Sequence, residues 1–286
     1  MAADILSKIQ NQMHSFSKGQ KLIANYILES YDKAAFMTAS KLGKTVRVSE
    51  STVVRFAVEL GYEGYPEMQK VLQELVRNKL TSVQRIEVAN DRIGDQDVVS
   101  TVLQADMDSI RMTNETLDRV EMDACVQTIK KAKTIYIVGV RSSAALASYL
   151  NFYLRNIFDS VRLVESTATS EMFEQLLRVR EEDVVIGISL PRYSSRTVKV
   201  MQYAHDSGAT VIAITDKRDA PAGKVADHVL VAKSDMVSVV DSLVAPMSVI
   251  NALVVCIGRS ERQKVEKTFE DLETLWDEYD VYERVE

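Results

Sequence analysis

Two short segments of this chain combine hydroxyl and guanidinium groups in a way that suits anion binding. GVRSSAA at 139–145 follows one β-branched run and opens a helical pattern, and SLPRYSSRT at 189–197 does the same. Free backbone N–H groups and the positive end of the helix dipole meet at such a turn. One such loop is more often only a helix cap, but two at the carboxyl edge of a parallel sheet would share a crevice. We therefore expect a site for a phosphorylated, polyhydroxylated ligand, formed by Arg141, Ser142, Ser143, Ser189, Arg192, Ser194, Ser195 and Thr197.

A second candidate site lies in residues 37–65, which read as two short helices joined by a tight turn. Ser49 is placed to cap the second helix and Gly61 to end it, and Val53, Phe56 and Leu60 form its apolar stripe. Ser17 and Thr38 are placed to cap two earlier helices in the same way. This layout is typical of a helix-turn-helix, whose second helix enters the DNA major groove. Arg55 could span guanine O6 and N7 or bind a phosphate. The expected DNA contacts are Lys44, Arg47, Ser49, Glu50, Ser51, Thr52 and Arg55, with Lys41 a further phosphate candidate. An amphipathic bundle with a solvated charged face is the alternative.

The elements around these sites suggest two domains. Helical spacing of apolar residues runs through residues 1–80, and periodicity is lost over 81–95, which we expect to be a linker. From residue 96 onward, helical patterns alternate with β-branched runs at 134–138, 161–165, 184–188, 210–214 and 228–231. Such alternation predicts an α/β body, 96–286, with a parallel sheet covered by helices on both faces. Two closing helices, at about 237–257 and 260–283, carry an apolar stripe that would pack on a neighbouring subunit or on their own domain.

Composition constrains the partners and the compartment. Of 286 residues, 46% are hydrophobic and only 10 are Gly and 4 Pro, as in a globular, mostly helical protein. The net charge of -6 hides an asymmetry, because residues 1–80 hold 11 Lys/Arg against 8 Asp/Glu. A mildly basic head on an acidic body fits a DNA-reading domain joined to another module. Two distant cysteines and no secretory signal indicate a reducing cytoplasm, and polar residues interrupt the apolar run 237–257, which favours a buried helix over a membrane span.

The segment 17–76 resembles the amino-terminal domain of the RpiR/MurR family of bacterial transcriptional regulators, through SKGQKLIANYILES, MTASKL and VSESTVVRFAVELGYEGYPEM. Residues 121–257 resemble the SIS (sugar isomerase) domain that follows that head. The resemblance implies a five-stranded parallel sheet, dimerisation, and a phosphosugar at loops matching Ser142, Ser143, Ser189, Ser194 and Thr197. Three positions depart from the family pattern. Arg47, Arg141 and Ser195 stand where glycine is usual, and the second loop is longer than usual.

These features predict a regulator whose affinity for a palindromic double-stranded operator is controlled by a phosphorylated sugar or sugar acid, in a homodimer or homotetramer. A sugar-phosphate isomerase is the alternative, and it requires a base near neutral pKa. His14, His205 and His228 are better explained as structural or surface residues, and Glu165 and Glu171 pair with nothing in a recognisable motif. We therefore expect no enzyme, no catalytic residues and no cofactor. Neither the Gly-x-Gly-x-x-Gly fingerprint of dinucleotide binding nor metal-ligand spacing is present.

Overall fold

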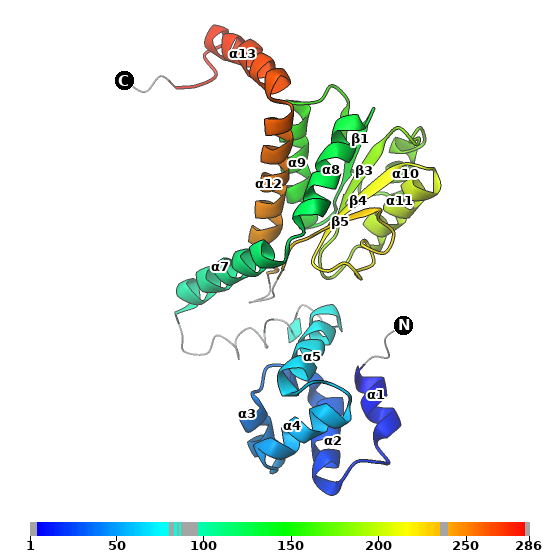
Figure 1. The fold of residues 1–286 in the computed structure, drawn as a ribbon, viewed down its shortest axis with the longest axis vertical. Helices are drawn as coiled ribbons and strands as arrows, with labels where there is room; N and C mark the ends of the chain where they lie inside the picture. The colour runs from blue at the N-terminus through cyan, green and yellow to red at the C-terminus, as the bar shows by residue number, and fades with distance from the viewer. Residues whose placement is uncertain (1–4, 80–82, 85, 87–96, 235–239, 284–286) are drawn as a thin grey trace. The chain divides into compact units, whose positions relative to one another are not determined.

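The structure is a computed structural model that describes residues 5–79, 83–84, 86, 97–234 and 240–283 (Figure 1). Packing divides the chain into two compact units, the first of residues 1–101 and 236–240 and the second of residues 102–235 and 241–286. Most of the expected linker, 81–95, lies outside the described residues.

The first unit is entirely helical, as expected. Its elements are α1 (Ile5–Gln12), α2 (Lys18–Ala34), α3 (Ala39–Val46), α4 (Glu50–Glu59) and α5 (Tyr65–Lys79). Ser17, Thr38 and Ser49 each accept a hydrogen bond from a backbone N–H of the first turn that follows them, so three sequence-predicted caps are confirmed. One apolar cluster contains buried side chains from all five helices, and Phe16 and Phe56 stack in it with ring centroids 5.1 Å apart.

The second unit is a five-stranded parallel sheet of order β2-β1-β3-β4-β5, which confirms the predicted fold class. The strands are β1 (Ile135–Val138), β2 (Val161–Val164), β3 (Val184–Ile188), β4 (Thr210–Thr215) and β5 (His228–Val231). The helices are α7 (Val98–Thr116), α8 (Arg119–Lys131), α9 (Ser143–Arg155), α10 (Thr169–Gln175), α11 (Ser195–Asp206), α12 (Val244–Ser260) and α13 (Arg262–Glu278). Helices α8, α9 and α12 cover one face, and α10 and α11 cover the other (Figure 1).

Alternation of side chains along the strands explains this two-sided covering. Ile135 and Ile137 face α8, α9 and α12, whereas Tyr136 and Val138 face α10 and α11. A strand buried on both faces therefore needs an apolar residue at every position, and β1 and β3 are buried throughout. The edge strand β2 is the exception, since Arg162 is exposed.

The two closing helices are shorter than the sequence suggested. Helix α12 begins at Val244 and not at 237, and α13 ends at Glu278. Pro246 explains the first difference, because proline has no N–H and fits only the first turn of a helix. Residues 237–239 of the expected helix lie outside the described residues. In the described part of the chain no single helix is long and apolar enough to span a bilayer, and α12 and α13 would qualify only together, across a 97° bend.

Two glycines in this unit give a matched test of packing. A Cβ at Gly187 in β3 would lie 2.2 Å from Sδ of the buried Met201, whereas a Cβ at Gly258 in α12 meets nothing within 4 Å. Gly187→Ala should therefore lower the free energy of unfolding by about 1–3 kcal/mol through overpacking. Gly258→Ala should raise it by about 0.5–1 kcal/mol, since alanine is the better helix former. Urea denaturation of both variants checks this, and equal effects would contradict the packing of α11 on β3.

Candidate functional site

The turn between α3 and α4 is held by close backbone contact. Val48 N–H donates to the carbonyl of Gly43 at 2.8 Å. A Cβ at Gly43 would lie 2.9 Å from Val48 O, so only glycine allows this approach. Arg47 ends α3 in the left-handed region, with φ 59° and ψ 46°, so the substituted arginine adopts the conformation for which the family uses glycine.

Left-handed backbone at Arg47 predicts different effects for two substitutions. A non-glycine residue in this region costs roughly 1 kcal/mol, so Arg47→Gly should unfold with a free energy about 1 kcal/mol higher than Arg47→Ala. Both variants remove the exposed cation and should weaken DNA binding equally, with the salt dependence reduced by about one phosphate contact. Thermal denaturation and anisotropy titrations at two salt concentrations measure the two effects. If both variants bind DNA with wild-type affinity, Arg47 does not contact the DNA.

Helix α4 separates a buried face from an exposed one. Val53, Phe56 and Ala57 are buried, whereas Glu50, Ser51 and Arg55 are exposed. Arg55 Nε donates to the carbonyl of Ser51 at 3.3 Å, which directs the guanidinium toward the amino end of the helix. Groove-reading residues of helix-turn-helix proteins lie at that end.

The other expected DNA contacts surround this face. Ser49 Oγ lies 2.8 Å from both Ser51 Oγ and Thr52 Oγ1, so the three hydroxyls form one cluster at the start of α4. Lys41, Lys44 and Arg47 are exposed on α3 and at its end. The arrangement can bind phosphate and base edges together.

Two apolar residues of α4 were not among the expected contacts. Val54 and Val58 are 38% and 53% exposed on the outward side of the helix, beside Ser51 and Arg55. An exposed methyl surface on such a helix can contact the C5-methyl group of thymine. The sequence does mark these two residues, because valines four positions apart and outside the buried stripe have no role in the core.

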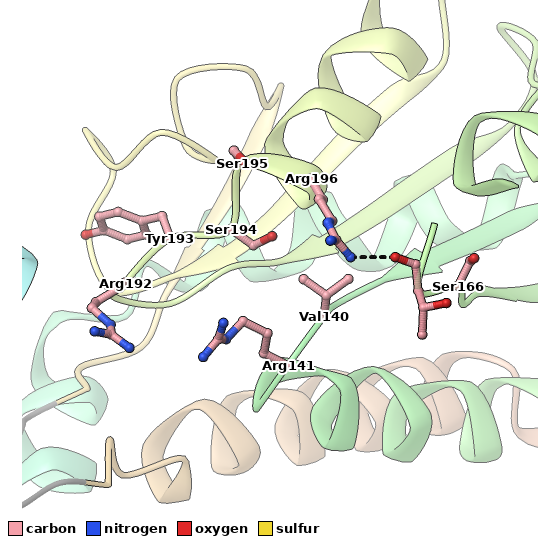
Figure 2. A pocket seen from close by; sticks show the side chains of 9 residues that line it. Val140, Arg141, Ser166, Arg192, Tyr193, Ser194, Ser195 and Arg196 are labelled. Carbon is pink, nitrogen blue, oxygen red and sulfur yellow. Dashed lines mark hydrogen bonds between the residues drawn. The ribbon is translucent and has the colours of Figure 1, made fainter. Parts of the chain in front are cut away.

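The second candidate site is a pocket of about 650 Å³ at the carboxyl ends of the strands (Figure 2). Its wall comes from three segments, which follow β1, β2 and β3. The chain places β2 on one side of β1 and then β3 on the other, so the direction in which strands are added reverses between β1 and β3. Ligands of open parallel sheets bind outside such a reversal point. The pocket wall consists of Val140, Arg141, Ser166, Thr167, Arg192, Tyr193, Ser194, Ser195 and Arg196.

Four of the eight expected ligand residues belong to this wall, namely Arg141, Arg192, Ser194 and Ser195. Arg141 adopts a left-handed conformation, with φ 59°, at a position where the family pattern has glycine. Ser194 also caps α11, because its Oγ accepts from Thr197 N–H at 3.4 Å. Capping and pocket lining are thus combined in one serine.

The other four expected residues lie outside the pocket wall, and their role in ligand binding stays a prediction. Ser142 is exposed before α9 and makes no capping hydrogen bond with its side chain, and Ser143 is buried. Ser189 Oγ and Thr197 Oγ1 are buried without a hydrogen-bond partner in the described structure.

Five wall residues were missed by the sequence analysis: Val140, Ser166, Thr167, Tyr193 and Arg196. Ser166 hydrogen-bonds to Glu171, and Arg196 Nη1 donates to the carbonyl of Thr167 at 2.8 Å. This second bond, dashed in Figure 2, joins the segment after β2 to α11. Tyr193 Oη donates to Asp216 Oδ1 at 2.8 Å and thereby ties the long loop to the end of β4.

The charge of the pocket wall is strongly positive. Its nine residues include three guanidiniums and no carboxylate. Arg196 hydrogen-bonds to the carbonyl of Thr167, whereas in Figure 2 the guanidiniums of Arg141 and Arg192 lie apart from that bond and point toward each other. The wall can therefore hold negative charge at more than one place, beside neutral hydroxyl groups.

The imidazoles lie away from this pocket. His14 is exposed in the first unit, and His205 is close to Asp206 and Asp227 on the surface. His228 begins β5, at the amino edge of the sheet, where its Nδ1 lies 3.6 Å from Glu121 Oε1. Among the described residues no group of His, Cys, Asp and Glu could hold a metal ion.

Comparison with known proteins assigns both units to domain families. Residues 3–79 match the helix-turn-helix domain of the rpiR family, and residues 128–256 match the SIS domain. A protein of Haemophilus influenzae, described as an uncharacterised HTH-type transcriptional regulator, is 28% identical over 244 residues, 80% of each chain. One of Clostridium perfringens with the same description is 26% identical over 231 residues, 79% of this chain and 80% of that protein.

Solved structures give the same assignment. The sugar isomerase domain of an RpiR transcription factor from Sphaerobacter thermophilus covers 63% of this chain and 99% of its own, with 26% identity and a TM-score of 0.60. The NanR protein of Vibrio vulnificus, solved in complex with ManNAc-6P, shares the fold over 95% of this chain and 98% of its own, with 22% identity and a TM-score of 0.59. A helix-turn-helix domain of the rpiR type followed by a SIS domain places this chain in the RpiR family of transcriptional regulators.

Proposed function

We propose that this protein binds double-stranded operator DNA through α4 and that a phosphorylated sugar or sugar acid in the pocket sets its affinity for that DNA. The observation that carries the proposal is the combination of two sites in one chain. An exposed Ser51–Arg55 face begins the second helix of a helix-turn-helix, and a cationic, hydroxyl-lined pocket lies at the reversal point of the sheet. The DNA contacts proposed are those of α4 and of the exposed cations of α3.

The chemistry of the pocket wall supports the choice of ligand. A phosphate monoester carries about −1.5 to −2 charges at neutral pH, so three guanidiniums exceed what one phosphate neutralises. A carboxylate on the same ligand would balance the remaining charge, and sugar hydroxyls would pair with Ser166, Thr167, Ser194 and Ser195. The binding of ManNAc-6P to the related NanR supports a phosphosugar as the general class.

Symmetry of the assembly follows from the DNA half of the proposal. A two-fold homodimer or a homotetramer presents two reading helices related by symmetry. The operator would then be a palindrome whose half-sites lie about one helical turn apart, or a multiple of that distance. A DNA-binding regulator of this kind would act in the cytoplasm.

An isomerase is the second candidate, and the pocket wall disfavours it. Proton transfer between neighbouring carbons needs a positioned base. None of the nine described wall residues is a histidine or a carboxylate, and Glu171 stands behind Ser166 and hydrogen-bonds to it. We therefore propose a binding site without turnover.

DNA binding measured with and without ligand tests the whole proposal. Fluorescence anisotropy on DNA from the promoter next to the gene would be repeated with aldose phosphates, N-acylated amino-sugar phosphates and aldonic acid phosphates. One class should change the affinity about 5- to 150-fold, the range typical of coupling between sites. Turnover of a phosphosugar with no effect on DNA binding would favour the isomerase instead.

A further inference from the structure

Helix α13 has an apolar surface that its own chain covers only in part. None of its residues is buried. Val265 packs against the body's core, and Lys264 Nζ lies 5.2 Å from the centre of the Phe158 ring. The bend of 97° after α12 turns the helix away from that core (Figure 1). An apolar stripe nevertheless runs its length, through Val265, Phe269, Leu272, Leu275, Trp276 and Tyr279. Leu275 is 49% exposed and Tyr279 is 70% exposed, whereas the other stripe residues are half-buried, so part of the stripe faces solvent in the single chain.

The stripe is symmetric about its middle residue. Val265 and Tyr279 stand seven positions before and after Leu272, and Phe269 and Leu275 stand three positions before and after it. A sequence of this kind matches itself when a second copy runs in the opposite direction, because Val265, Phe269, Leu272, Leu275 and Tyr279 then each meet an apolar residue. Trp276, which stacks edge-to-face on Phe269 and on Tyr282, widens the same stripe.

The charges of α13 select the antiparallel direction. The first half, Arg262 to Phe269, contains three basic residues and one acidic residue, whereas Glu270 to Glu278 contains five acidic residues and no basic one. A parallel pair would place like charges side by side along its whole length. An antiparallel pair places each basic half beside an acidic half, and Lys264 and Glu278 lie on the same edge of the stripe, two heptads apart.

We propose that α13 pairs with α13 of a second copy of this chain, antiparallel and centred on Leu272. Leu272 contacts the partner's Leu272, and Phe269 contacts the partner's Leu275. Lys264 lies within one helical turn of the partner's Glu278. This inference names one interface of the homo-oligomer proposed above and is independent of the DNA and the phosphosugar.

Sedimentation of the full-length protein tests the pairing. At micromolar concentration Leu272→Glu should halve the molecular mass relative to the wild type, because it sets two carboxylates against each other at the centre of the interface. Gln263→Glu is the matched control, since it adds the same group on the opposite face of α13 and should leave the mass unchanged. An unchanged mass in Leu272→Glu would overturn the pairing.

Charge exchange tests the direction of the two helices. Lys264→Glu and Glu278→Lys should each weaken the association, and the double variant should restore it. Disulfide trapping gives an independent reading, in a Cys256→Ser background that removes the half-buried thiol. The double variant Phe269→Cys, Leu275→Cys should cross-link, whereas Leu275→Cys alone should not. Cross-linking of Leu275→Cys alone would indicate a parallel pair and overturn the proposal.

The outcomes separate this interface from the oligomer as a whole. If Leu272→Glu stays a dimer or tetramer of wild-type mass, the oligomer is held by another surface and only the role of α13 fails. If the wild type is itself a monomer at these concentrations, both proposals fail. Circular dichroism of Leu272→Glu should match the wild type, because Leu272 is not buried in the single chain.

Discussion

Arg55→Ala is expected to weaken binding to the operator by about 5- to 150-fold, which corresponds to the 1–3 kcal/mol of a specific arginine–base contact. The guanidinium is exposed, and its hydrogen bond to the carbonyl of Ser51 holds it toward the amino end of α4. A side chain fixed at the entering end of the helix loses little entropy when it binds. Anisotropy titrations with operator and with scrambled DNA give the specific part of the loss.

Arg55→Lys separates the two roles open to this residue. Lysine keeps the charge but lacks the planar fork that pairs with guanine O6 and N7. If Arg55 reads a base, the lysine variant should lose discrimination between operator and scrambled DNA while keeping its salt dependence. If Arg55 binds a phosphate, lysine should restore most of the affinity. Equal operator affinity for wild type and Arg55→Ala would remove Arg55 from the interface.

The head was the part most fully predicted from the sequence, because its determinants are local. A helix cap depends on a side chain and a backbone N–H two or three residues away, so Ser17, Thr38 and Ser49 were recognisable from their position before apolar periodic runs. Gly61, expected to end the fourth helix, has φ of +83° just after α4. The sequence showed only that Arg47 stands where glycine is usual, and the structure adds that it adopts the left-handed conformation.

The body was predicted in its fold but only partly in its pocket. β-Branched runs place strands, and alternation places their faces, but the pocket wall depends on which strands become neighbours. Because β2 pairs with β1, the segment after β2 contributes Ser166 and Thr167, although no sequence pattern marked it. The hydroxyls of Ser189 and Thr197 are buried outside the pocket wall, and their role in ligand binding stays a prediction. Side-chain direction at a strand end is set by these long-range contacts.

Arg141 is expected to select ligands that carry a carboxylate. If its guanidinium pairs with a carboxylate on the ligand, the wild type should prefer an aldonic acid phosphate over the matching aldose phosphate. A hydrogen bond to a charged group contributes about 1.5–3 kcal/mol, so the preference should be roughly 10- to 150-fold. Arg141→Ala should abolish that preference. The variant should retain affinity for the phosphate, because Arg192 and Arg196 remain in the pocket wall. Calorimetric titration of both ligands measures the ratio directly.

Two further variants make this test specific to the position. Arg178→Ala removes an exposed arginine outside the pocket wall and should leave the ratio unchanged, so a similar loss in both variants would indicate only a general effect of net charge. Arg141→Gly should lose the preference as Arg141→Ala does. It should unfold at a higher temperature than Arg141→Ala, because glycine removes the left-handed strain at φ 59°. The Arg141 side chain lines the pocket from a strained backbone position, which is the reason to seek its role in the ligand. If Arg141→Ala discriminates between the two ligands as the wild type does, the guanidinium points away from the carboxylate and the second anionic group must be assigned to Arg192 or Arg196.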